Sequence, residues 1–266
     1  KTVTLGRTHW SDTNRVMLRN RRIGCSVSGV AQFITSRGLD ELQNWLENGY
    51  DTIQDWDKQY SDWFAVPKSI KTTSVKPSGT VSLLAGATPG LHYPESRFYI
   101  RRVRLSNHSE LLEPLKKAGY KIEPAFGSED TTMVVEVPVD VGEGIRTAAE
   151  LSIWEQFSLA AFLQRHWADN QVSCTATFNP ETEAEQLPYV LNYFQYRLKG
   201  ISLLPRHELG AYKQMPYESI DEKEYDKQIK KLGKLTFGVI KNEEAEIDKF
   251  CNNDSCEIPG EEIKST

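Results

Sequence analysis

The feature that most constrains the fold is an alternation of helical and strand patterns, clearest over residues 147–178. Thr147-Ala148-Ala149-Glu150 has the form of a capping box and predicts the start of a helix over about 148–167. Apolar side chains cover much of this helix, which indicates packing on more than one side. A strand is predicted next, over 172–178, because apolar and hydroxyl side chains alternate there. This order predicts an α/β protein whose sheet is open or closed into a barrel.

The remaining segments fit the same class. Strands are expected at residues 2–5, 72–76, 98–105 and 131–139. Between 39 and 64 the apolar residues fall at helical spacing, and Asn48-Gly49 predicts a break into two helices. Further helices are expected at 11–19, 29–35, 183–197 and 221–233, and a loop, helix and loop at 77–94.

Composition bounds the function classes. A chain of 266 residues with 39% hydrophobic and 26% charged residues is long enough to bury a sizeable core. Its net charge of -5 argues against nucleic acid and membrane surfaces as partners. No apolar run reaches about 18 residues and no secretion leader is present, so we expect no membrane span and a cytoplasmic location.

Two of the four cysteines, Cys251 and Cys256, stand in a polar and acidic tail over 242–266 that is expected to be flexible. A mobile dithiol can attack a disulfide through a mixed-disulfide intermediate and then resolve it with its second sulfur. The spacing alone favours this redox role no more than the alternatives, which are two idle thiols or half of a zinc site. Cys25 and Cys174 are expected to be core thiols.

A second candidate site is the turn Lys76-Pro77-Ser78-Gly79-Thr80-Val81-Ser82, where a strand passes into an apolar helix. Backbone N–H groups at a helix start are unpaired and favour phosphate, and the hydroxyls of Ser78 and Thr80 would add donors. The spacing of a Walker A loop is absent. On this pattern alone, an ordinary capped helix start is the favoured alternative.

A cluster of arginines marks the predicted strand at 98–105. Arg102 and Arg104 would share one face of it while Arg101 points the other way, so that one side would meet an anionic ligand. A solvated edge strand is the favoured interpretation. The histidines show no metal-ligand spacing, although His92 lies on a loop suited to line a pocket.

In this order the motifs closely resemble the C-terminal part of the adenosylcobalamin-dependent (class II) ribonucleoside-triphosphate reductases. The resemblance spans nearly the whole chain, and the combination is specific although each block alone is weak. The blocks that carry it are Asn20-Arg21-Arg22-Ile23-Gly24 with Ser26 and Ser28-Gly29, Thr73-Ser74-Val75-Lys76-Pro77-Ser78-Gly79-Thr80-Val81, Leu84-Ala85-Gly86-Ala87, Gly90, Asp169-Asn170, Val172-Ser173-Cys174-Thr175, Ser202-Leu203-Leu204-Pro205 and the Cys-x4-Cys tail.

The resemblance implies the ten-stranded α/β barrel of ribonucleotide reductases, with its later strands in residues 1–205. Residues 206–241 become a candidate contribution to the cobalamin site, and 242–266 the flexible redox tail. The resemblance also implies that Ser78, Gly79, Thr80 and Val81 hold the phosphates of a ribonucleoside triphosphate. It does not single out residues that contact adenosylcobalamin.

In the family, a cobalamin-derived radical passes to a cysteine that abstracts the 3′ hydrogen of the ribose. Two further cysteines reduce the 2′ carbon, a tail pair reduces the resulting disulfide, and thioredoxin regenerates the tail. By resemblance, Cys251 and Cys256 are that tail pair.

The radical and reducing cysteines belong to blocks upstream of the Asn-Arg-Arg-Ile-Gly motif that this sequence lacks, so we expect turnover to need an upstream half. Two hypotheses remain: a catalytic segment of the reductase, or a non-catalytic thiol-disulfide carrier or binding module derived from one.

Overall fold

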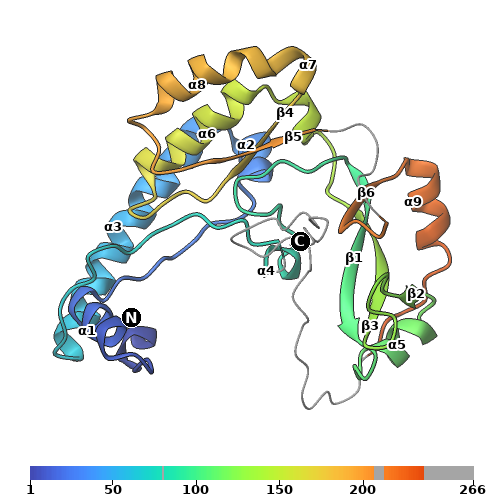
Figure 1. Ribbon diagram of the computed structural model, residues 1–266, viewed down its shortest axis with the longest axis horizontal. Helices are drawn as coiled ribbons and strands as arrows, with labels where there is room; N and C mark the ends of the chain where they lie inside the picture. Colours follow the sequence, from blue (N-terminus) through green and yellow to red (C-terminus); the bar gives the residue numbers. More distant parts are fainter. Residues whose placement is uncertain (80, 207–212, 237–266) are drawn as a thin grey trace, which may run out of the picture. The chain divides into compact units, whose positions relative to one another are not determined.

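The computed structural model describes residues 1–79, 81–206 and 213–236 (Figure 1). They form two compact units. Unit 1 comprises 1–93 and 144–206, and unit 2 comprises 94–143 and the residues from 207 on, of which 213–236 are described. Thr80, Cys251 and Cys256 lie outside the described residues. Within the described part of the chain, no helix combines the length and apolar character that a membrane crossing requires.

Unit 1 is organised around parallel extended segments. Strand β4 (Thr175–Phe178) pairs in parallel with β5 (Ser202–Pro205), with Thr175 opposite Ser202. Single parallel bridges, Cys25 to Thr73 and Val75 to Val172, continue the same arrangement. Four chain segments therefore run side by side in one direction, and helix follows the first three of them along the chain. This arrangement confirms the predicted α/β class.

Helices cover one face of these segments: α2 (Val30–Arg37), α3 (Leu39–Trp63), α6 (Ile153–His166) and α8 (Leu187–Phe194) (Figure 1). One buried cluster joins Val75, Val172 and Cys174 to α2, α3 and α6. A second joins Ala176 and Phe178 to α6 and α8. Alternate β4 positions therefore face the helices, as the hydropathy pattern predicts.

Two capping boxes shape the start of α6. The predicted box at Thr147 is present, with the Thr147 N–H donating to Glu150 Oε2 at 2.6 Å, but it begins only the short 3₁₀ helix η2 (Ala148–Glu150). A second box, Ser152 with Glu155, begins α6 itself. The single helix predicted over 148–167 is therefore two elements.

Two other predictions for unit 1 are wrong. Helix α3 runs unbroken through Gly49, because this glycine serves close packing: a Cβ there would lie 3.3 Å from the ring of Trp167. The predicted strand at 2–5 is the 3₁₀ helix η1 (Thr2–Leu5). The Lys1 ammonium anchors this segment, pairing with Asp57 at 3.0 Å.

The shorter helices of unit 1 complete the connections. Helix α1 (Ser11–Asn20) and the single turn α4 (Val81–Leu84) precede α6 in the chain. The predicted helix at 183–197 is divided into α7 (Pro180–Glu183), the 3₁₀ helix η3 (Ala184–Gln186) and α8. Pro at the start of α7 and of α8 suits the first helical turn, where its missing N–H costs nothing.

Unit 2 is an antiparallel sheet in the order β2-β3-β1-β6. The strands β1 (Phe98–Ser106) and β3 (Thr132–Asp140) confirm two predictions. Its other elements are β2 (Lys121–Pro124), β6 (Tyr217–Ser219), α5 (Leu112–Lys117) and α9 (Glu222–Ile229). The strands β2 and β6 are too short for their alternation to stand out in the sequence.

The arginines of β1 do not form a solvated edge. The strand lies inside the sheet, and Arg101 and Arg104 are buried. Arg102 pairs with Glu136 of β3 at 2.9 Å and with Glu218 of β6. Desolvation lowers the pKa of Arg102, but the hydrogen bonds and charges of these two carboxylates outweigh it, and the pKa is raised. The arginines therefore bind strands together, and the predicted edge strand is wrong.

Candidate functional site

The candidate phosphate turn leaves the carboxyl end of the extended segment at Thr73–Val75, the end at which parallel sheets bind ligands. The Lys76 N–H donates to Ser26 Oγ at 2.9 Å, which ties the turn to the neighbouring segment. Ser78 has a φ of 57°, and its carbonyl accepts from the Ser82 N–H at 3.2 Å and from the Ser82 hydroxyl. These contacts hold Ser78 at the start of the turn, and the Val81 side chain beyond it is exposed.

Gly90 fixes the position of the loop that follows α4. Its φ is +52°, and an added Cβ would lie 2.4 Å from the Lys76 carbonyl oxygen. No side chain fits at that distance, so the loop backbone touches the turn directly. This close approach is the physical reason for the glycine in the motif.

The start of α2 holds the same loop from a second side. The Gly29 N–H donates to the Thr88 carbonyl at 2.8 Å, and the Val30 N–H to the Gly90 carbonyl at 3.3 Å. The Gln32 side chain accepts from the Thr88 N–H at 2.8 Å and donates to the Gly86 carbonyl at 3.0 Å. Sequence reasoning missed Gln32, because its spacing carries no signal for a partner 56 residues away.

His92 links the loop to β4. Its Nε2 accepts from the Thr175 N–H at 3.2 Å, which requires a neutral ring. Burial lowers the pKa of His92, and a hydrogen bond with the backbone of Pro89 opposes this shift. The neutral tautomer therefore anchors the loop, a role that the sequence did not assign to this residue.

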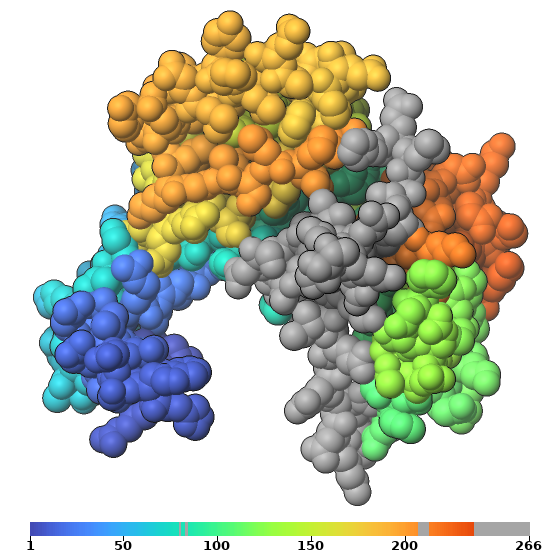
Figure 2. All heavy atoms as spheres, viewed as in Figure 1, coloured from blue at the N-terminus to red at the C-terminus, as the bar shows by residue number. Residues whose placement is uncertain are grey.

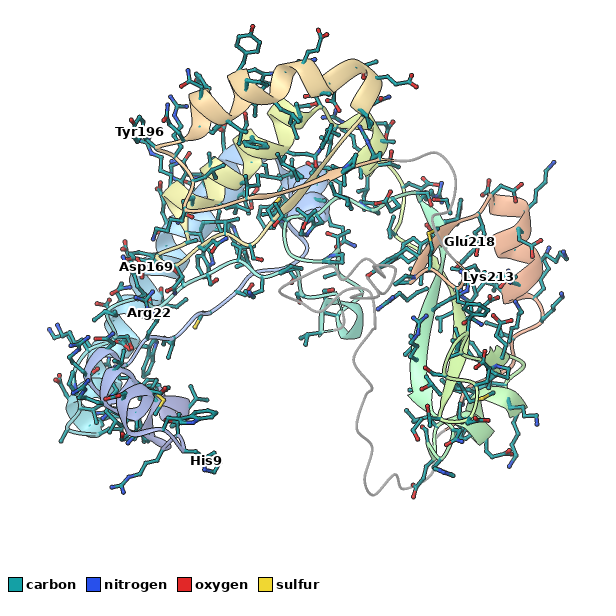
Figure 3. All side chains as sticks on the ribbon, in the orientation of Figure 1. His9, Arg22, Asp169, Tyr196, Lys213 and Glu218 are labelled. Atoms are coloured by element: carbon teal, nitrogen blue, oxygen red, sulfur yellow. The ribbon has the colours of Figure 1, made fainter. Side chains whose placement is uncertain are left out.

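The Asp169-Asn170 motif lies at the opposite, amino end of the parallel segments. Asn170 Nδ2 donates to the carbonyls of Ile23 at 2.9 Å and Thr73 at 2.7 Å, and its Oδ1 accepts from Arg22 at 2.9 Å. Asp169 accepts from the N–H and hydroxyl of Thr72, both at 3.0 Å. Figure 3 labels Arg22 and Asp169 at this end. These contacts bind the segments together at their amino ends. They do not involve the candidate phosphate turn at the carboxyl ends.

The two described cysteines differ from each other. Cys174 is buried, and burial raises the pKa of its thiol to about 12, which confirms it as a core thiol. Cys25 is exposed, so the prediction of a core position is wrong. Its backbone pairs with Thr73 while the neighbouring Gly24 packs against Ser74, which leaves the Cys25 side chain on the open side.

The described part of the predicted site consists of Ser78 and Gly79 in the turn and Val81 at the start of α4. The helix after it, α4, has four residues, so a helix dipole contributes little there. Any phosphate affinity must come from the backbone N–H groups and hydroxyls of the turn. Thr80 and the Cys251 and Cys256 pair are outside the residues that the structure describes.

The hollows in the described part of the chain do not have the lining that a corrin cofactor requires. The two best-formed hollows measure about 440 Å³ and 350 Å³, and charged and amide side chains dominate their linings. In the first, Tyr50 donates to Asp169 at 2.9 Å, and burial and then this carboxylate raise the pKa of Tyr50 to about 12. Neither lining offers the broad apolar floor that a corrin ring needs. Among the described residues, no group of three or more metal-ligating side chains converges either.

Comparison with solved structures gives the class. A crystal structure of a B12-dependent (class II) ribonucleotide reductase matches this chain with a TM-score of 0.77 and 33% identity, covering 88% of this chain and 36% of that one. The parallel segments, the covering helices and the packed turn thus belong to the ribonucleotide reductase class. No family model matches the chain.

The curated relatives narrow this class. A probable adenosylcobalamin-dependent ribonucleoside-triphosphate reductase of Dictyostelium discoideum is 56% identical over 97% of this chain and 34% of its own length. The adenosylcobalamin-dependent ribonucleoside-triphosphate reductase of Euglena gracilis is 56% identical over 96% of this chain and 36% of its own length. The chain belongs to the family of adenosylcobalamin-dependent ribonucleoside-triphosphate reductases, and it spans about a third of the length of these relatives.

Proposed function

We propose that this chain is part of an enzyme that converts ribonucleoside triphosphates to 2′-deoxyribonucleotides with adenosylcobalamin. The observation that carries the proposal is 56% identity over nearly the whole chain to reductases of that name. The structure supports it by gathering separate motifs around one turn: Ser26 and Gly29, Lys76 and Ser78, and Gly90. The proposed location is the cytoplasm.

The proposed role of the turn is to hold the substrate phosphates through Ser78, Gly79, Thr80 and Val81. Its place at the carboxyl end of a parallel segment supports this role, as does the loop packed behind it through Gly90. Backbone N–H groups in a turn suit phosphate oxygens, because they can point together at the anion.

The four parallel segments are proposed to be the later strands of a ten-stranded barrel. Their two edge segments, near Cys25 and at β5, would pair with strands from the rest of the enzyme. An unpaired strand edge is unfavourable for a soluble protein, which supports such pairing.

Adenosylcobalamin, when bound to the complete enzyme, would supply the radical that starts the reaction. Residues 206–241 are proposed to contribute to its site. The linings of the described hollows do not fit a corrin, so no step is assigned to them.

The tail pair, Cys251 and Cys256, is proposed to reduce the active-site disulfide and to be regenerated by thioredoxin. In this exchange one tail thiolate attacks the disulfide, the second tail thiol resolves the mixed disulfide, and the two electrons leave the tail as a new tail disulfide. Thioredoxin then supplies two electrons to that disulfide.

Reconstitution tests the proposal. The chain is mixed with the part of the Euglena gracilis relative that it does not match, and adenosylcobalamin, a ribonucleoside triphosphate and dithiothreitol are added. We expect deoxynucleotide from the mixture and none from either part alone. A mixture that binds but stays inactive would favour the non-catalytic thiol carrier.

Changing Cys251 and Cys256 to Ser tests the tail pair in the reconstituted mixture. The change should abolish turnover driven by thioredoxin and spare much of the turnover driven by dithiothreitol. Equal loss with both reductants would exclude the shuttle role.

A further inference from the structure

The end of unit 1 formed by η1, α1 and the last turns of α3 exposes an unusual amount of apolar surface. Nine of the nineteen large hydrophobic side chains that are exposed among the described residues lie in two short segments, 1–20 and 56–70. They are Val3, Leu5, Trp10, Val16, Trp56, Tyr60, Trp63, Phe64 and Ile70. Scattered exposed apolar residues need no explanation, but a concentration of this kind marks an interaction site.

Four of these side chains form one aromatic cluster, defined as Trp56, Tyr60, Trp63 and Phe64. The Tyr60 ring centroid lies 5.5 Å from that of Trp56, 5.4 Å from that of Trp63 and 6.0 Å from that of Phe64. Spacings of four and three residues place them on one side of α3. Trp63 remains 67% exposed and Trp56 45% exposed, so the cluster is ordered by its own contacts but uncovered.

Helix α1 leads to the same conclusion by a different observation. None of its ten residues is buried. A helix of this length is marginal on its own in water, and most helices in proteins are stabilised by packing an apolar face. Its described contacts are polar and lie largely at its surface: the exposed ion pair of Asp12 with Arg15, a hydrogen bond from the Thr8 N–H to Asn14 at 3.3 Å, and the bond from Ile70 to the Asn20 carbonyl. Met17 and Leu18 are half-buried and Val16 is exposed, so the apolar side of α1 is only partly covered.

This end of unit 1 is nevertheless held in place. The buried Lys1 ammonium bonds to Asp57 at 3.0 Å and to the Pro67 carbonyl at 2.9 Å, and the Ile70 N–H donates to the Asn20 carbonyl at 3.0 Å. Figure 2 shows these segments, in dark blue and cyan, at the end of unit 1 farthest from α8. The surface is thus a fixed platform.

We propose that the aromatic cluster and α1 form the surface on which the remaining two thirds of the reductase docks. This inference rests on the proposed function and adds where the partner binds. The chain spans only 34% of its Dictyostelium relative, so a large part of such an enzyme has to pack somewhere on this chain. Exposed charges of both signs flank this surface, Asp55 and Asp62 together with Lys58, so the partner surface should combine an apolar centre with a rim of mixed charge.

Binding measurements test the surface without any need for turnover. The chain carrying both Trp56→Ser and Trp63→Ser is titrated by calorimetry with the unmatched part of the Euglena gracilis relative, in the absence of cofactor and nucleotide. Loss of central aromatic contacts should raise the dissociation constant at least about 30-fold. The matched control is Tyr189→Ser on α8, whose side chain is 71% exposed and should leave affinity unchanged. Circular dichroism of each variant checks that it folds.

Three outcomes would overturn the proposal: no binding by the parent chain, equal binding by the double variant, or a dimer of the chain alone that the double variant abolishes. The last would assign the surface to a second copy of this chain. In a second measurement, hydrogen exchange of residues 11–20 should slow on binding. Failure of the proposed function would be distinguishable from failure of this proposal. Two parts that bind through this surface but make no deoxynucleotide would contradict the proposed activity and would still support the docking surface.

Discussion

The two ends of the parallel segments in unit 1 are built on different principles. At the carboxyl ends the contacts are made by backbone atoms and small residues, with Gly90 against Lys76 and Ser26 bonded to the turn. At the amino ends they are made by side chains, with Asn170 bonded to two carbonyls and to Arg22. The same family motifs supply both ends. Membership of a motif therefore does not by itself mean contact with a ligand.

Gly90→Ala should give the largest effect at the carboxyl end. The new Cβ would have to displace a backbone carbonyl 2.4 Å away, and the φ of +52° adds strain. We expect the free energy of unfolding to fall by about 3 kcal/mol and nucleotide affinity by at least about tenfold. Chemical denaturation and calorimetry with a ribonucleoside triphosphate measure the two quantities.

Gly86→Ala is the matched control. Its φ of +61° is similar, but nothing lies within 4 Å of the added Cβ. It should cost only about 1 kcal/mol and leave nucleotide affinity unchanged. Equal losses in the two variants would show that left-handed backbone strain, and not the contact with Lys76, is what matters.

Asn170→Ala should destabilise the amino end without a direct effect on the site. The change leaves the carbonyls of Ile23 and Thr73 without these donors, and we expect the unfolding free energy to fall by about 2 kcal/mol. Nucleotide affinity, measured well below the unfolding midpoint, should stay within about twofold. Asn44→Ala on the exposed side of α3 is the control for stability. A large loss of affinity with little loss of stability would erase the distinction between the two ends.

The sequence predicted the elements whose pattern is local. The alternation around β4, the long antiparallel strands β1 and β3 and the capping box at Thr147 were all visible within a few residues. The pattern around Gly49 predicts a break, because the Trp167 ring that packs on this glycine comes 118 residues later in the chain. The exposure of Cys25 likewise depends on the tertiary fold. Helices from other parts of the chain cover one face of the parallel segments, and the Cys25 side chain lies on the other face.

The same contrast holds for the local structure around the candidate site. The turn at Ser78 followed from its strand-to-helix pattern and from the family resemblance. Its supports, Gln32 and His92, did not, because a single amide or imidazole has no periodicity and its partner is set by the tertiary fold. Such residues are found by asking where the backbone hydrogen bonds of a loop go.

Ser78→Gly should separate the contribution of the side-chain hydroxyl to nucleotide binding from that of the backbone at the turn. Glycine adopts the φ of 57° without strain and keeps the carbonyl that accepts from Ser82, so stability should be unchanged or slightly higher. Loss of the hydroxyl should weaken nucleotide binding by about tenfold, the effect of one hydrogen bond to an anion. Ala65→Gly relieves a similar φ of 51° outside the turn and should not change binding. Unchanged affinity in Ser78→Gly would exclude a role for the hydroxyl.

The smallest expected effect is a pH dependence from His92. Because burial lowers the pKa of His92 in the folded chain, the unfolded chain binds this proton first as the pH falls below about 6.5. The stability contribution of the neutral ring is therefore complete above that pH and declines below it, until the lowered pKa of the folded state is passed. Denaturation midpoints at pH 7.5 and pH 5.5 should reveal a slope that His92→Gln reduces, since a glutamine oxygen can still accept from Thr175 but does not titrate. His9→Gln, at an exposed residue labelled in Figure 3, should leave the slope as it is. If both variants retain the full slope, protonation of His92 is not the source of this pH dependence.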